Sequence, residues 1–356
     1  MKILMVIPYL GSGGAERVLS GLANDWAINK NCTIHLAILM EGNDFYNINE
    51  NVKIHRLGYS PNDSGKFKKL FKLLFDLRSL IKDISPDVCL SFIRESNIIT
   101  LLSTRGINTK VVISERDSPK AYVSKPYKIM RKILYPLSSG IIVQTEDYRK
   151  FIEDDIGFLN TEVIFNPVRH IPTEDYLREN IIICVGRLIP TKGHKYLIEA
   201  FSKCELKENW KLVILGDGLL QNDLQAQIKA LNLSDKIELM GAVKNVDYWL
   251  AKASIFAFTS LSEGFPNALA EGMSASLPCV SFDCITGPKE LIENGKNGYL
   301  VDLCDTDNFS KKLDTLMASE ALRKKFGRNA KEKANTLDFK MISEKYFGFI
   351  IKTLAS

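Results

Sequence analysis

The sequence predicts an α/β protein built from two doubly wound domains. The chain has 356 residues, which is too long for one average domain and suits two. Short apolar runs alternate with segments of helical periodicity along its length. Most of these runs are apolar throughout, as expected for parallel strands that helices cover on both faces. A composition of 46% hydrophobic and 25% charged residues is that of a soluble globular protein and argues against disorder.

The expected strands are spaced so that a helix fits between most of them. In the first half they cover residues 2–8, 32–39, 87–92, 110–114, 140–145 and 162–165, and in the second half 181–186, 211–216, 236–240, 254–259, 278–282 and 298–301. Pro167, Pro172 and a polar cluster at 173–175 indicate a linker at about residues 166–180. We therefore expect domains at residues 1–168 and 169–338. The last segment, 339–354, is amphipathic and is expected to be a helix.

Several protein classes are disfavoured by what the sequence lacks. No apolar run approaches the roughly 20 residues that span a bilayer, and the run at residues 3–10 is broken by Pro8, which is typical of a strand and not of a signal peptide. The seven cysteines are odd in number and form no C-x-x-C pair, so we expect buried free thiols in a reducing cytoplasm. None of the four histidines stands beside a serine or cysteine nucleophile motif, which argues against a hydrolase triad.

The turn after the first strand is rich in glycine. Gly11, Gly13 and Gly14 precede a segment of helical periodicity that runs to about Ile28. Glycines let backbone amides approach a phosphate, and a helix N-terminus adds partial positive charge. The spacing does not match G-x-G-x-x-G, so a dinucleotide site is disfavoured, and a plain tight turn stays an alternative.

The turn after the first strand of the second half carries two cations between glycines. Gly186-Arg187 is followed after four residues by Lys192-Gly193. An arginine fork and a compact lysine charge at a strand end would suit a diphosphate. Two exposed loop cations are the alternative.

Two further strands of the second half end in glycine turns. These turns are Gly216-Asp217-Gly218 and Gly241-Ala242-Val243. A flat base or a ribose could approach the backbone at either place, because glycine has no side chain to exclude it. Each could also be an ordinary connection.

The strongest pattern follows the expected strand 254–259. Glu263 and Glu271 are separated by seven residues across a Gly-Phe-Pro-Asn turn that should open a helix at about Asn267. Carboxylates are good acceptors for the vicinal hydroxyls of a sugar or a ribose, and free amides of Asn267, Ala268 and Leu269 at the helix start suit a phosphate. Two unrelated surface glutamates would not account for the whole set.

Together these motifs resemble those of glycosyltransferase family 4. The family's ordered set matches Gly13-Gly14-Ala-Glu, Gly186-Arg187-(x4)-Lys192-Gly193, Gly216-Asp217-Gly218 and Glu263-(x7)-Glu271, within residues 2–301. Segments 113–116 and 281–292 are similar to those of bacterial members that extend polyprenyl-pyrophosphate-linked glycans, such as the N-acetylgalactosaminyltransferases of lipid-linked oligosaccharide assembly. The resemblance implies a GT-B fold, in which two Rossmann-like domains face each other across a cleft, and a C-terminal helix, 339–356, that crosses back to the first domain.

The resemblance also implies roles for the donor-site residues. Arg187 and Lys192 would hold the donor diphosphate and stabilise the departing charge, and Glu263 would bind the hydroxyls of the transferred sugar, so these three are the expected catalytic residues. Glu271 would bind the ribose, and the donor would be UDP-GalNAc, UDP-Gal or UDP-Glc. The other residues expected to contact the donor are Gly14, Gly216, Gly241, Val243, Asn267, Ala268 and Leu269.

The acceptor side is expected in the first domain. Arg116 follows Ile113-Ser-Glu, where many relatives have a histidine, so a cationic contact to a sugar or to an acceptor phosphate takes the place of any histidine-specific role. The residues expected to bind the acceptor are Glu115, Arg116, Arg17, Lys68, Lys69 and Lys72.

Basic residues gather in the first half of the chain. Residues 60–140 hold 15 lysines and arginines against 7 aspartates and glutamates, while the whole chain has a net charge of only +5. Residues 66–82 have helical periodicity, with Lys68, Lys69 and Lys72 expected on one side. The apolar stripe expected on the other side consists of Phe67, Leu70, Phe71, Leu74, Leu77 and Ile81. Our hypothesis is that this helix and a basic cluster at 120–132 meet an anionic membrane and the pyrophosphate of a lipid acceptor, with an ordinary core helix as the alternative.

The predicted function is retaining sugar transfer from a nucleotide sugar to a lipid-linked glycan, at the cytoplasmic face of the inner membrane and without nucleic acid. No metal or other cofactor is expected, because positioning and fixed cations would supply the catalysis. Asp305-Thr-Asp307 spells a metal-binding D-x-D but is interpreted as a helix start. A GT-B sugar-nucleotide epimerase is the second candidate, and an NAD-dependent oxidoreductase is the third.

Overall fold

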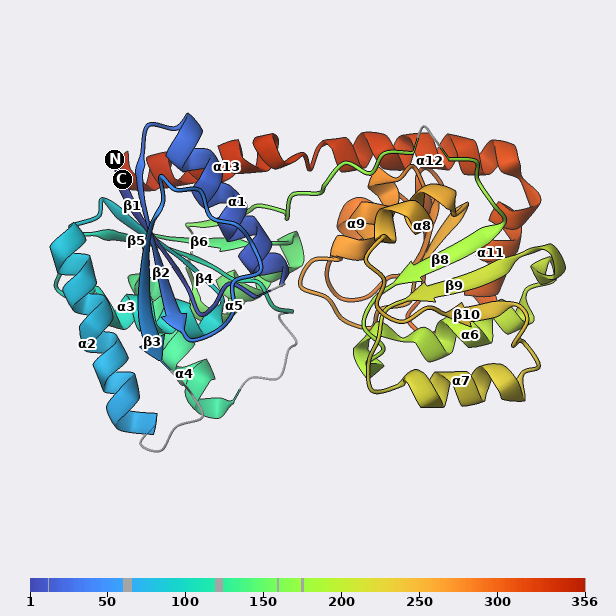
Figure 1. Ribbon diagram of the computed structural model, residues 1–356, viewed down its shortest axis with the longest axis horizontal. Helices are drawn as coiled ribbons and strands as arrows, with labels where there is room; N and C mark the ends of the chain where they lie inside the picture. Colours follow the sequence, from blue (N-terminus) through green and yellow to red (C-terminus); the bar gives the residue numbers. More distant parts are fainter. Residues whose placement is uncertain (12, 60–65, 119–123, 159, 174–175, 356) are drawn as a thin grey trace. The chain divides into compact units, whose positions relative to one another are not determined.

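A computed structural model of the chain describes residues 1–11, 13–59, 66–118, 124–158, 160–173 and 176–355, without the side chains of 66–69. The chain divides into two compact units, each with its own sheet (Figure 1). The first unit holds Met1–Asn166 and Lys340–Ser356, and the second holds Pro167–Phe339. The division after Asn166 falls in the proline-containing segment that the sequence marked as a linker.

The first unit is built on a seven-stranded parallel sheet in the order β3-β2-β1-β4-β5-β6-β7. Its inner strands are apolar and buried, because helices cover both faces. The strands are β1 (Lys2–Ile7), β2 (Thr33–Met40), β3 (Lys53–Tyr59), β4 (Val88–Phe92), β5 (Lys110–Ser114), β6 (Gly140–Val143) and β7 (Thr161–Val163).

Strand β3 was not predicted from the sequence. It lies at the edge of the sheet, and most of its residues are exposed or half-buried. An edge strand pairs on one side only, so its polar residues can stay in water. No continuous apolar run therefore marks β3, and the prediction from apolar runs missed it.

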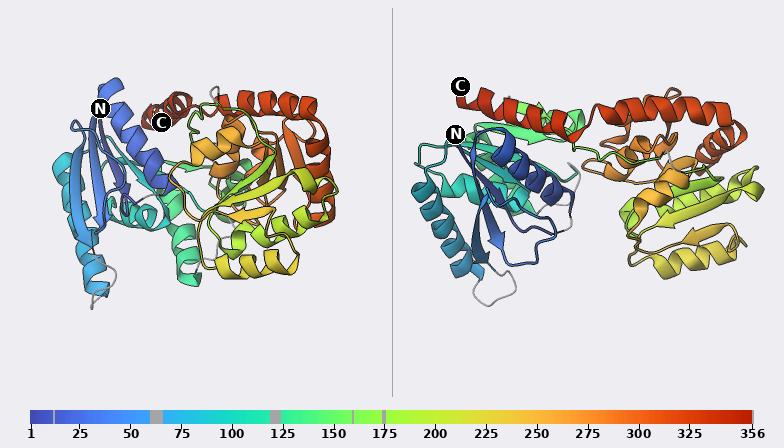
Figure 2. Two further views of the ribbon diagram at one scale, coloured as in Figure 1. Left: turned by 45° about the vertical axis from the view of Figure 1, so that its right-hand side comes forward. Right: turned by 45° about the horizontal axis from the view of Figure 1, so that its top comes forward.

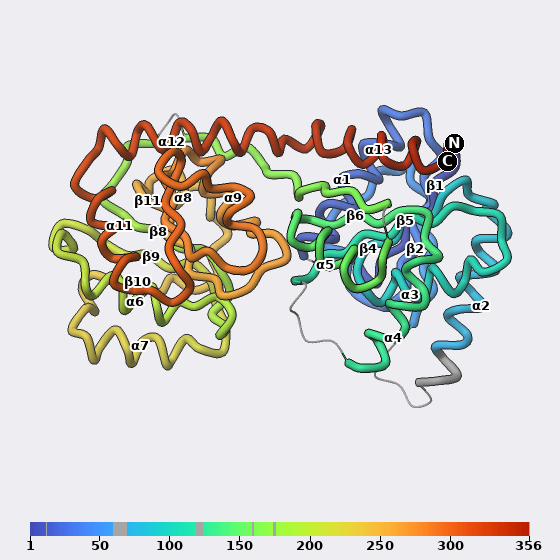
Figure 3. Tube along the Cα trace, turned by 180° about the vertical axis from the view of Figure 1, so that it is seen from behind, coloured from blue at the N-terminus to red at the C-terminus, as the bar shows by residue number. Residues whose placement is uncertain are grey.

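Helices cover both faces of the first sheet. On one face pack α2 (Lys66–Ile84), α3 (Arg94–Ser103), α4 (Lys125–Leu134), the short helix η1 (Tyr135–Leu137) and α5 (Glu146–Ile156). On the other face, α1 (Gly14–Asn29) and the C-terminal helix α13 (Phe339–Ala355) lie side by side (Figure 3). The Trp26 indole of α1 donates to the Ser343 hydroxyl of α13 at 2.9 Å. The last helix of the chain thus belongs to the first unit.

The second unit contains a six-stranded parallel sheet in the order β10-β9-β8-β11-β12-β13. All six strands lie where the sequence predicted them, with ends shifted by one residue at most. The strands are β8 (Ile181–Val185), β9 (Lys211–Leu215), β10 (Ile237–Leu239), β11 (Ile255–Phe258), β12 (Cys279–Phe282) and β13 (Gly298–Val301).

The second sheet also has helices on both faces, as two further views show (Figure 2). Helices α6 (His194–Lys203), α7 (Gln221–Ala230) and α11 (Thr306–Ala318) contribute to the core on one face. On the other face lie α8 (Val246–Lys252) and α9 (Asn267–Ser274), and α12 (Glu320–Asn335) packs against α9. The short helices are η2 (Pro190–Lys192), η3 (Lys207–Asn209) and α10 (Pro288–Leu291).

The buried side of helix α2 differs in part from the predicted one. Leu77 and Ile81 of the expected apolar stripe are buried, as predicted, but Leu70 and Phe71 of the same stripe are exposed. The helix also buries Leu73, which the stripe did not include, and exposes Phe75. Lys72 is exposed, next to these exposed apolar side chains. The side chains of Lys68 and Lys69 lie outside the described residues.

Three smaller expectations can be compared with the structure. Asp305 caps α11, since its Oδ1 accepts from the Asn308 amide at 2.9 Å, which confirms the interpretation as a helix start. The seven cysteines are free; five are buried, whereas Cys304 is exposed and Cys32 half-buried. Among the described helices, none combines the length and the apolar character needed to cross a membrane.

Candidate active site

The residues singled out in the second unit gather at one edge of its sheet. The chain enters at β8 in the middle, builds β9 and β10 on one side and then β11 to β13 on the other. Doubly wound sheets bind ligands at such a switch point, outside the carboxyl ends of the strands. Arg187 and Lys192 follow β8, and Glu263 follows β11, so all three lie at the switch point.

Lys192 and Glu263 form an ion pair. The Lys192 Nζ lies 2.5 Å from the Glu263 Oε1, and the two side chains are only 22% and 11% exposed. At this depth a charge pair interacts more strongly than in open water. Lys192, expected to bind the diphosphate, is thus paired with Glu263, expected to bind the sugar. A single ammonium group can therefore contact both parts of a donor.

Gly193 fixes the turn that carries Lys192. Its φ is +65°, and a Cβ there would lie 2.1 Å from the carbonyl oxygen of Thr259. The Thr259 hydroxyl donates to the Lys192 carbonyl at 3.3 Å. The turn after β8 therefore packs backbone against backbone on the end of β11, and no other residue fits at position 193 without movement.

The protein's own backbone requires glycine in the turn after β9. Gly216 has φ +141°, and a Cβ there would lie 2.1 Å from the Gly186 carbonyl oxygen. The Gly216 amide donates to the Gly241 carbonyl at 2.8 Å. These contacts join three neighbouring turns into one layer. The expected contacts of Gly216, Gly241 and Val243 with a base stay predictions.

His194 supports the turn of Arg187 and was missed at the sequence level. It begins α6 and is buried, with Nε2 3.2 Å from the Arg187 carbonyl oxygen and Nδ1 3.6 Å from the Cys184 Sγ. Burial lowers the pKa of this imidazole, so the ring is neutral and acts as a support. The Arg187 side chain is exposed, and no carboxylate pairs with it among the described residues.

The loop that carries Glu263 is held from β12. The Thr286 hydroxyl donates to the Glu263 carbonyl oxygen. Gly287, with φ +102°, lets the same segment approach Pro266, since a Cβ there would lie 2.4 Å from Pro266 Cδ. The side chain of Glu263 is thus positioned by its own turn, by Lys192 and by the segment after β12.

Glu271 has a partner that the sequence did not suggest. Arg169, in the linker, places Nε 3.4 Å from the Glu271 Oε1 and Nη1 2.5 Å from the Asp247 Oδ1. A ribose at Glu271 would share the carboxylate with this arginine. The sequence shows only an arginine within a proline-containing linker. This feature is too common to predict the contact with Glu271.

The start of α9 differs in part from the expectation. Asn267 is the first residue of α9, but its amide donates to the Phe265 carbonyl at 2.9 Å. The prediction that the Asn267 amide is free for a phosphate is therefore wrong, because the turn before the helix uses it. The expected amide contacts of Ala268 and Leu269 stay predictions.

Glu115 is buried in the first unit. The residue is 1% exposed, and its carboxylate accepts from the hydroxyls of Tyr127, Tyr135 and Tyr148. Burial raises the pKa of this carboxyl group. The expectation that Glu115 contacts the acceptor is not met, because no accessible oxygen is left; it ties α4, η1 and α5 to the end of β5.

A pH dependence of stability follows from Glu115. A carboxyl group whose pKa is raised by folding binds more protons in the native state than in the unfolded state. Its contribution to the free energy of unfolding is therefore lost as the pH rises above about 4.5, which is its pKa in the unfolded state. We expect the variant Glu115→Gln to gain stability relative to the wild type as the pH rises from 4 to 7. Urea denaturation at both pH values measures this difference, and a difference independent of pH would contradict it.

Arg116 is also held inside the first unit. Its guanidinium lies 4.0 Å from the centroid of the Phe92 ring and donates at 2.5 Å to the Asn166 Oδ1 and to the Tyr346 hydroxyl. Burial lowers the pKa of this arginine. These contacts link the end of β5 to α13. Arg116 is half-buried, and its expected contact with an acceptor phosphate stays a prediction.

Other side chains, missed at the sequence level, lie at the carboxyl ends of β1, β4 and β5. Arg94 pairs with Asp117 at 2.6 Å. Tyr9 is 44% exposed, and burial and nearby carboxylates, Glu16 first among them, raise its pKa. Ile93, directly after β4, has φ +75°, a strained value for a β-branched residue. The sequence held one signal for this site, because Arg94 and Asp117 come shortly after the buried strands β4 and β5.

The glycine turn after β1 starts α1 in the first unit. Gly14 is the first helical residue, and Gly13 caps the helix with φ −75°. A Cβ on Gly13 would lie 2.2 Å from the Glu16 Oε2, so this glycine makes room for a buried carboxylate. The contacts expected of Gly14 with a donor phosphate and of Arg17 with an acceptor stay predictions.

Comparisons with known proteins agree with this architecture. A family model described as glycosyl transferases group 1 matches residues 170–333, and one described as glycosyl transferase 4-like matches residues 19–144. Solved structures with the same fold include the lipopolysaccharide outer core galactosyltransferase WaaB, with a TM-score of 0.82, 20% identity and 99% of each chain covered. Anabaena Alr3699/HepE has a TM-score of 0.81 and 18% identity, over 99% of this chain and all of that one.

Two relatives from Campylobacter jejuni are similar over nearly the whole chain. One is named GalNAc-alpha-(1->4)-GalNAc-alpha-(1->3)-diNAcBac-PP-undecaprenol alpha-1,4-N-acetyl-D-galactosaminyltransferase; it is 30% identical over 98% of both chains. The other is named N-acetylgalactosamine-N,N'-diacetylbacillosaminyl-diphospho-undecaprenol 4-alpha-N-acetylgalactosaminyltransferase; it is 32% identical over 95% of this chain and 96% of the relative.

Proposed function

Because the chain belongs to the glycosyl transferases of group 1, with the GT-B fold, we propose that it transfers N-acetylgalactosamine from a UDP-sugar to a polyprenyl-pyrophosphate-linked glycan with retention of configuration. The two Campylobacter jejuni relatives support the sugar and the acceptor class, since both names state them. UDP-Gal and UDP-Glc are the other donors to test.

The Lys192–Glu263 ion pair is the observation that carries this proposal. Its atoms lie 2.5 Å apart at the switch point, and the exposed Arg187 follows the same strand, β8, as Lys192 does. A nucleotide sugar presents a diphosphate next to sugar hydroxyls, and this cluster presents two cations next to a carboxylate. Cations match the phosphates, and the carboxylate accepts from hydroxyls.

The proposed reaction exchanges one bond for another at the anomeric carbon. The bond to the donor phosphate breaks, an acceptor hydroxyl forms the new bond on the same face, and the leaving phosphate takes the hydroxyl proton. Arg187 and Lys192 stabilise the charge on the departing diphosphate, so that positioning and fixed charges do the catalytic work without a metal ion. Nothing in the site favours the epimerase or the NAD-dependent alternative, and the curated relatives are transferases.

A panel of nucleotide sugars tests the proposal. The full-length protein is incubated with UDP-GalNAc, UDP-Gal or UDP-Glc, with and without a synthetic polyprenyl-pyrophosphate glycan, and UDP release is measured. We expect release that depends on the acceptor and is fastest with UDP-GalNAc. Equal release without the acceptor would contradict transfer, and equal release by Arg187→Ala and Glu263→Ala variants would contradict the site.

We also propose that α2 and α4 bring the protein to a membrane surface. On α2, Phe71 and Phe75 are 61% and 69% exposed, and on α4, Ile129 and Ile133 are 59% and 62% exposed. Exposed lysines accompany them, Lys72 on α2 among them. Apolar side chains flanked by basic ones suit the interface of an anionic leaflet, which supports a peripheral location at the cytoplasmic face.

Vesicle flotation tests this location. The double variant Phe71→Ser/Phe75→Ser is expected to bind liposomes with anionic lipid at least about tenfold more weakly, because each exposed ring contributes apolar area in the interface. Leu219→Ser is the matched control, since Leu219 is 91% exposed in the second unit. Unchanged flotation of the double variant would remove α2 from the proposed surface.

A further inference from the structure

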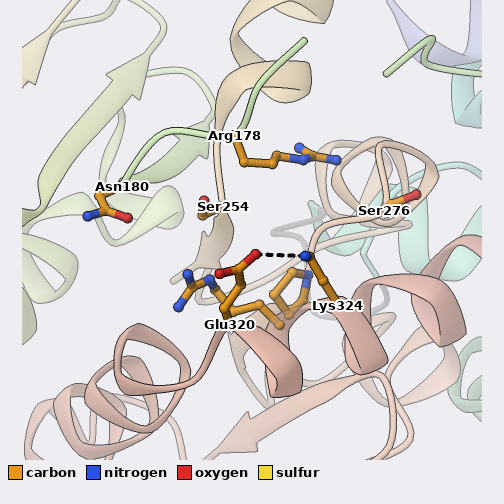
Figure 4. A pocket seen from close by; sticks show the side chains of 8 residues that line it. Arg178, Asn180, Ser254, Ser276, Glu320 and Lys324 are labelled. Atoms are coloured by element: carbon orange, nitrogen blue, oxygen red, sulfur yellow. Dashed lines mark ion pairs between the residues drawn. The ribbon is translucent and has the colours of Figure 1, made fainter. Parts of the chain in front are cut away.

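A second group of cations lies at the opposite edge of the second sheet, where the strands begin. A cavity of about 220 Å³ opens there, lined by residues that precede β8, β11 and β12 and by the first turn of α12. Figure 4 shows Arg178 above this cavity, with its side chain extending toward Ser276, and Glu320 and Lys324 on the facing helix. None of these residues belongs to the proposed donor site.

Arg178 is tethered in a way that leaves one edge of its guanidinium available. Its Nη1 donates to the carbonyl oxygens of Leu250 and Ala253 at 2.9 and 2.7 Å, and its Nη2 donates to that of Ala275 at 2.5 Å. Three of the five N–H groups are therefore used. The Nε–H and the second N–H of Nη2 remain for another acceptor.

Arg323 repeats this arrangement from α12. Its Nη1 donates to the carbonyl oxygens of Leu316 and Met317 at 2.8 and 2.9 Å, and its guanidinium lies 5.1 Å from the centroid of the Trp210 ring. Again the Nε and Nη2 side is left. Both arginines thus line one cavity with a side that suits the two oxygens of an oxyanion.

The charge of this cluster is only partly balanced. Arg178 has no carboxylate partner among the described residues, and displacement of water by the surrounding protein lowers its pKa to about 10. Lys324 pairs with Glu320 at 2.7 Å, and both of these side chains are exposed. The lining therefore carries three cations and one carboxylate, an arrangement that an anion would stabilise.

Hydroxyl and amide groups complete the lining. Ser276 and Asn180 also line the cavity, and a hydroxyl and a side-chain amide can each donate to an anionic oxygen. A cavity needs roughly 10–15 Å³ of this volume for one water, so the space admits an ion with an attached group. Arg178 and Lys324 are exposed, which gives an ion access.

We propose that this cavity binds a phosphate group, held by the guanidinium edges of Arg178 and Arg323 and by Lys324, at a site separate from the donor site. The bound group joins α12 to the residues that precede β8 and β11, so it stabilises the second unit. The phosphate belongs either to the free ion or to a soluble phosphorylated compound, and the same chemistry recognises both.

Ligand-dependent stability tests this site. The thermal midpoint is measured against inorganic phosphate and, separately, glucose 6-phosphate, with chloride as the control at equal ionic strength. Each experiment is repeated in the Arg187→Ala background, which removes a phosphate-binding arginine from the donor site. We expect a saturable rise in the midpoint that persists in this background. A larger rise with glucose 6-phosphate identifies a phosphorylated compound as the ligand, and an equal rise identifies the free ion.

Variants of α12 separate the site from nonspecific charge effects. Lys324→Gln and Arg323→Lys are each expected to weaken phosphate binding at least about tenfold, the second because lysine keeps the charge but lacks the planar edge. Lys325→Gln is the matched control, since Lys325 is an exposed neighbour on the same helix that does not line the cavity. The proposal is overturned if phosphate causes no saturable shift, or if all three variants bind it like the wild type.

Discussion

Replacing Lys192 by alanine is expected to lower kcat about 10²–10³-fold, the range seen when one preorganised donor to a developing negative charge is removed. The change removes the cation beside the proposed leaving diphosphate. It also leaves Glu263, whose side chain is 11% exposed, without the partner that now lies 2.5 Å away. The unpaired carboxylate would repel the donor phosphates, so we expect KM for the nucleotide sugar to rise as well. Steady-state UDP release measures both constants.

Two controls make this result specific to the ion pair. Lys195→Ala removes an exposed lysine from the first turn of α6, whose ammonium lies 4.8 Å from the centroid of the Tyr196 ring. This variant should leave kcat within about twofold. The double variant Lys192→Ala/Glu263→Ala should be less impaired than the product of the two single effects, because the partners act as a unit. Multiplicative effects would mean that the two residues act independently.

Gly193→Ala is expected to destabilise the protein by about 2–5 kcal/mol and to lower activity at least about tenfold. A Cβ would lie 2.1 Å from the Thr259 carbonyl oxygen, and the φ of +65° adds strain for any residue with a side chain. Relief of the clash requires the turn after β8 to move away from β11, and Lys192 moves with it. Urea denaturation and the UDP-release assay together measure the two effects.

Gly241→Ala measures the cost of a left-handed backbone without a steric clash. Gly241 has nearly the same φ, +67°, but a Cβ there would meet nothing within 4 Å. This variant should cost only about 1–2 kcal/mol, the penalty of a left-handed backbone alone. If both variants lose the same stability, the close contact between the turns after β8 and β11 does not explain the loss in Gly193→Ala.

The second unit was predicted from the sequence more completely than the first. Its strands are continuous apolar runs, such as Ile255–Phe258, because helices cover both faces of the sheet. The exposed edge strand β3 lacks such a run, and the alternation of exposed and half-buried residues over Lys53–Tyr59 gave no comparable signal. Helix α2 shows the limit of periodicity, since 3.6-residue spacing predicts a stripe but not which side of a broad stripe is buried.

The candidate site was predictable where the motifs are local in sequence. Arg187, Lys192 and Glu263 follow buried strands, and strand ends meet at a switch point. The pairing of Arg169 with Glu271 joins residues 102 positions apart and left no local pattern. Glu115 looked like an exposed polar residue at a strand end, yet three tyrosines from later elements enclose it. Such enclosure depends on tertiary packing, which spacing along the chain does not encode.

The configuration of the first-turnover product shows whether the protein transfers N-acetylgalactosamine with retention. The protein is mixed with UDP-GalNAc, an α-linked donor, and a polyprenyl-pyrophosphate glycan, and the coupling constant of the new anomeric proton is measured by NMR before secondary reactions occur. We expect an α-linked N-acetylgalactosamine on the glycan, formed by the wild type and by Lys195→Ala but not by Lys192→Ala on the same timescale. A β-linked product, or an unmodified glycan with UDP released into water, would contradict it.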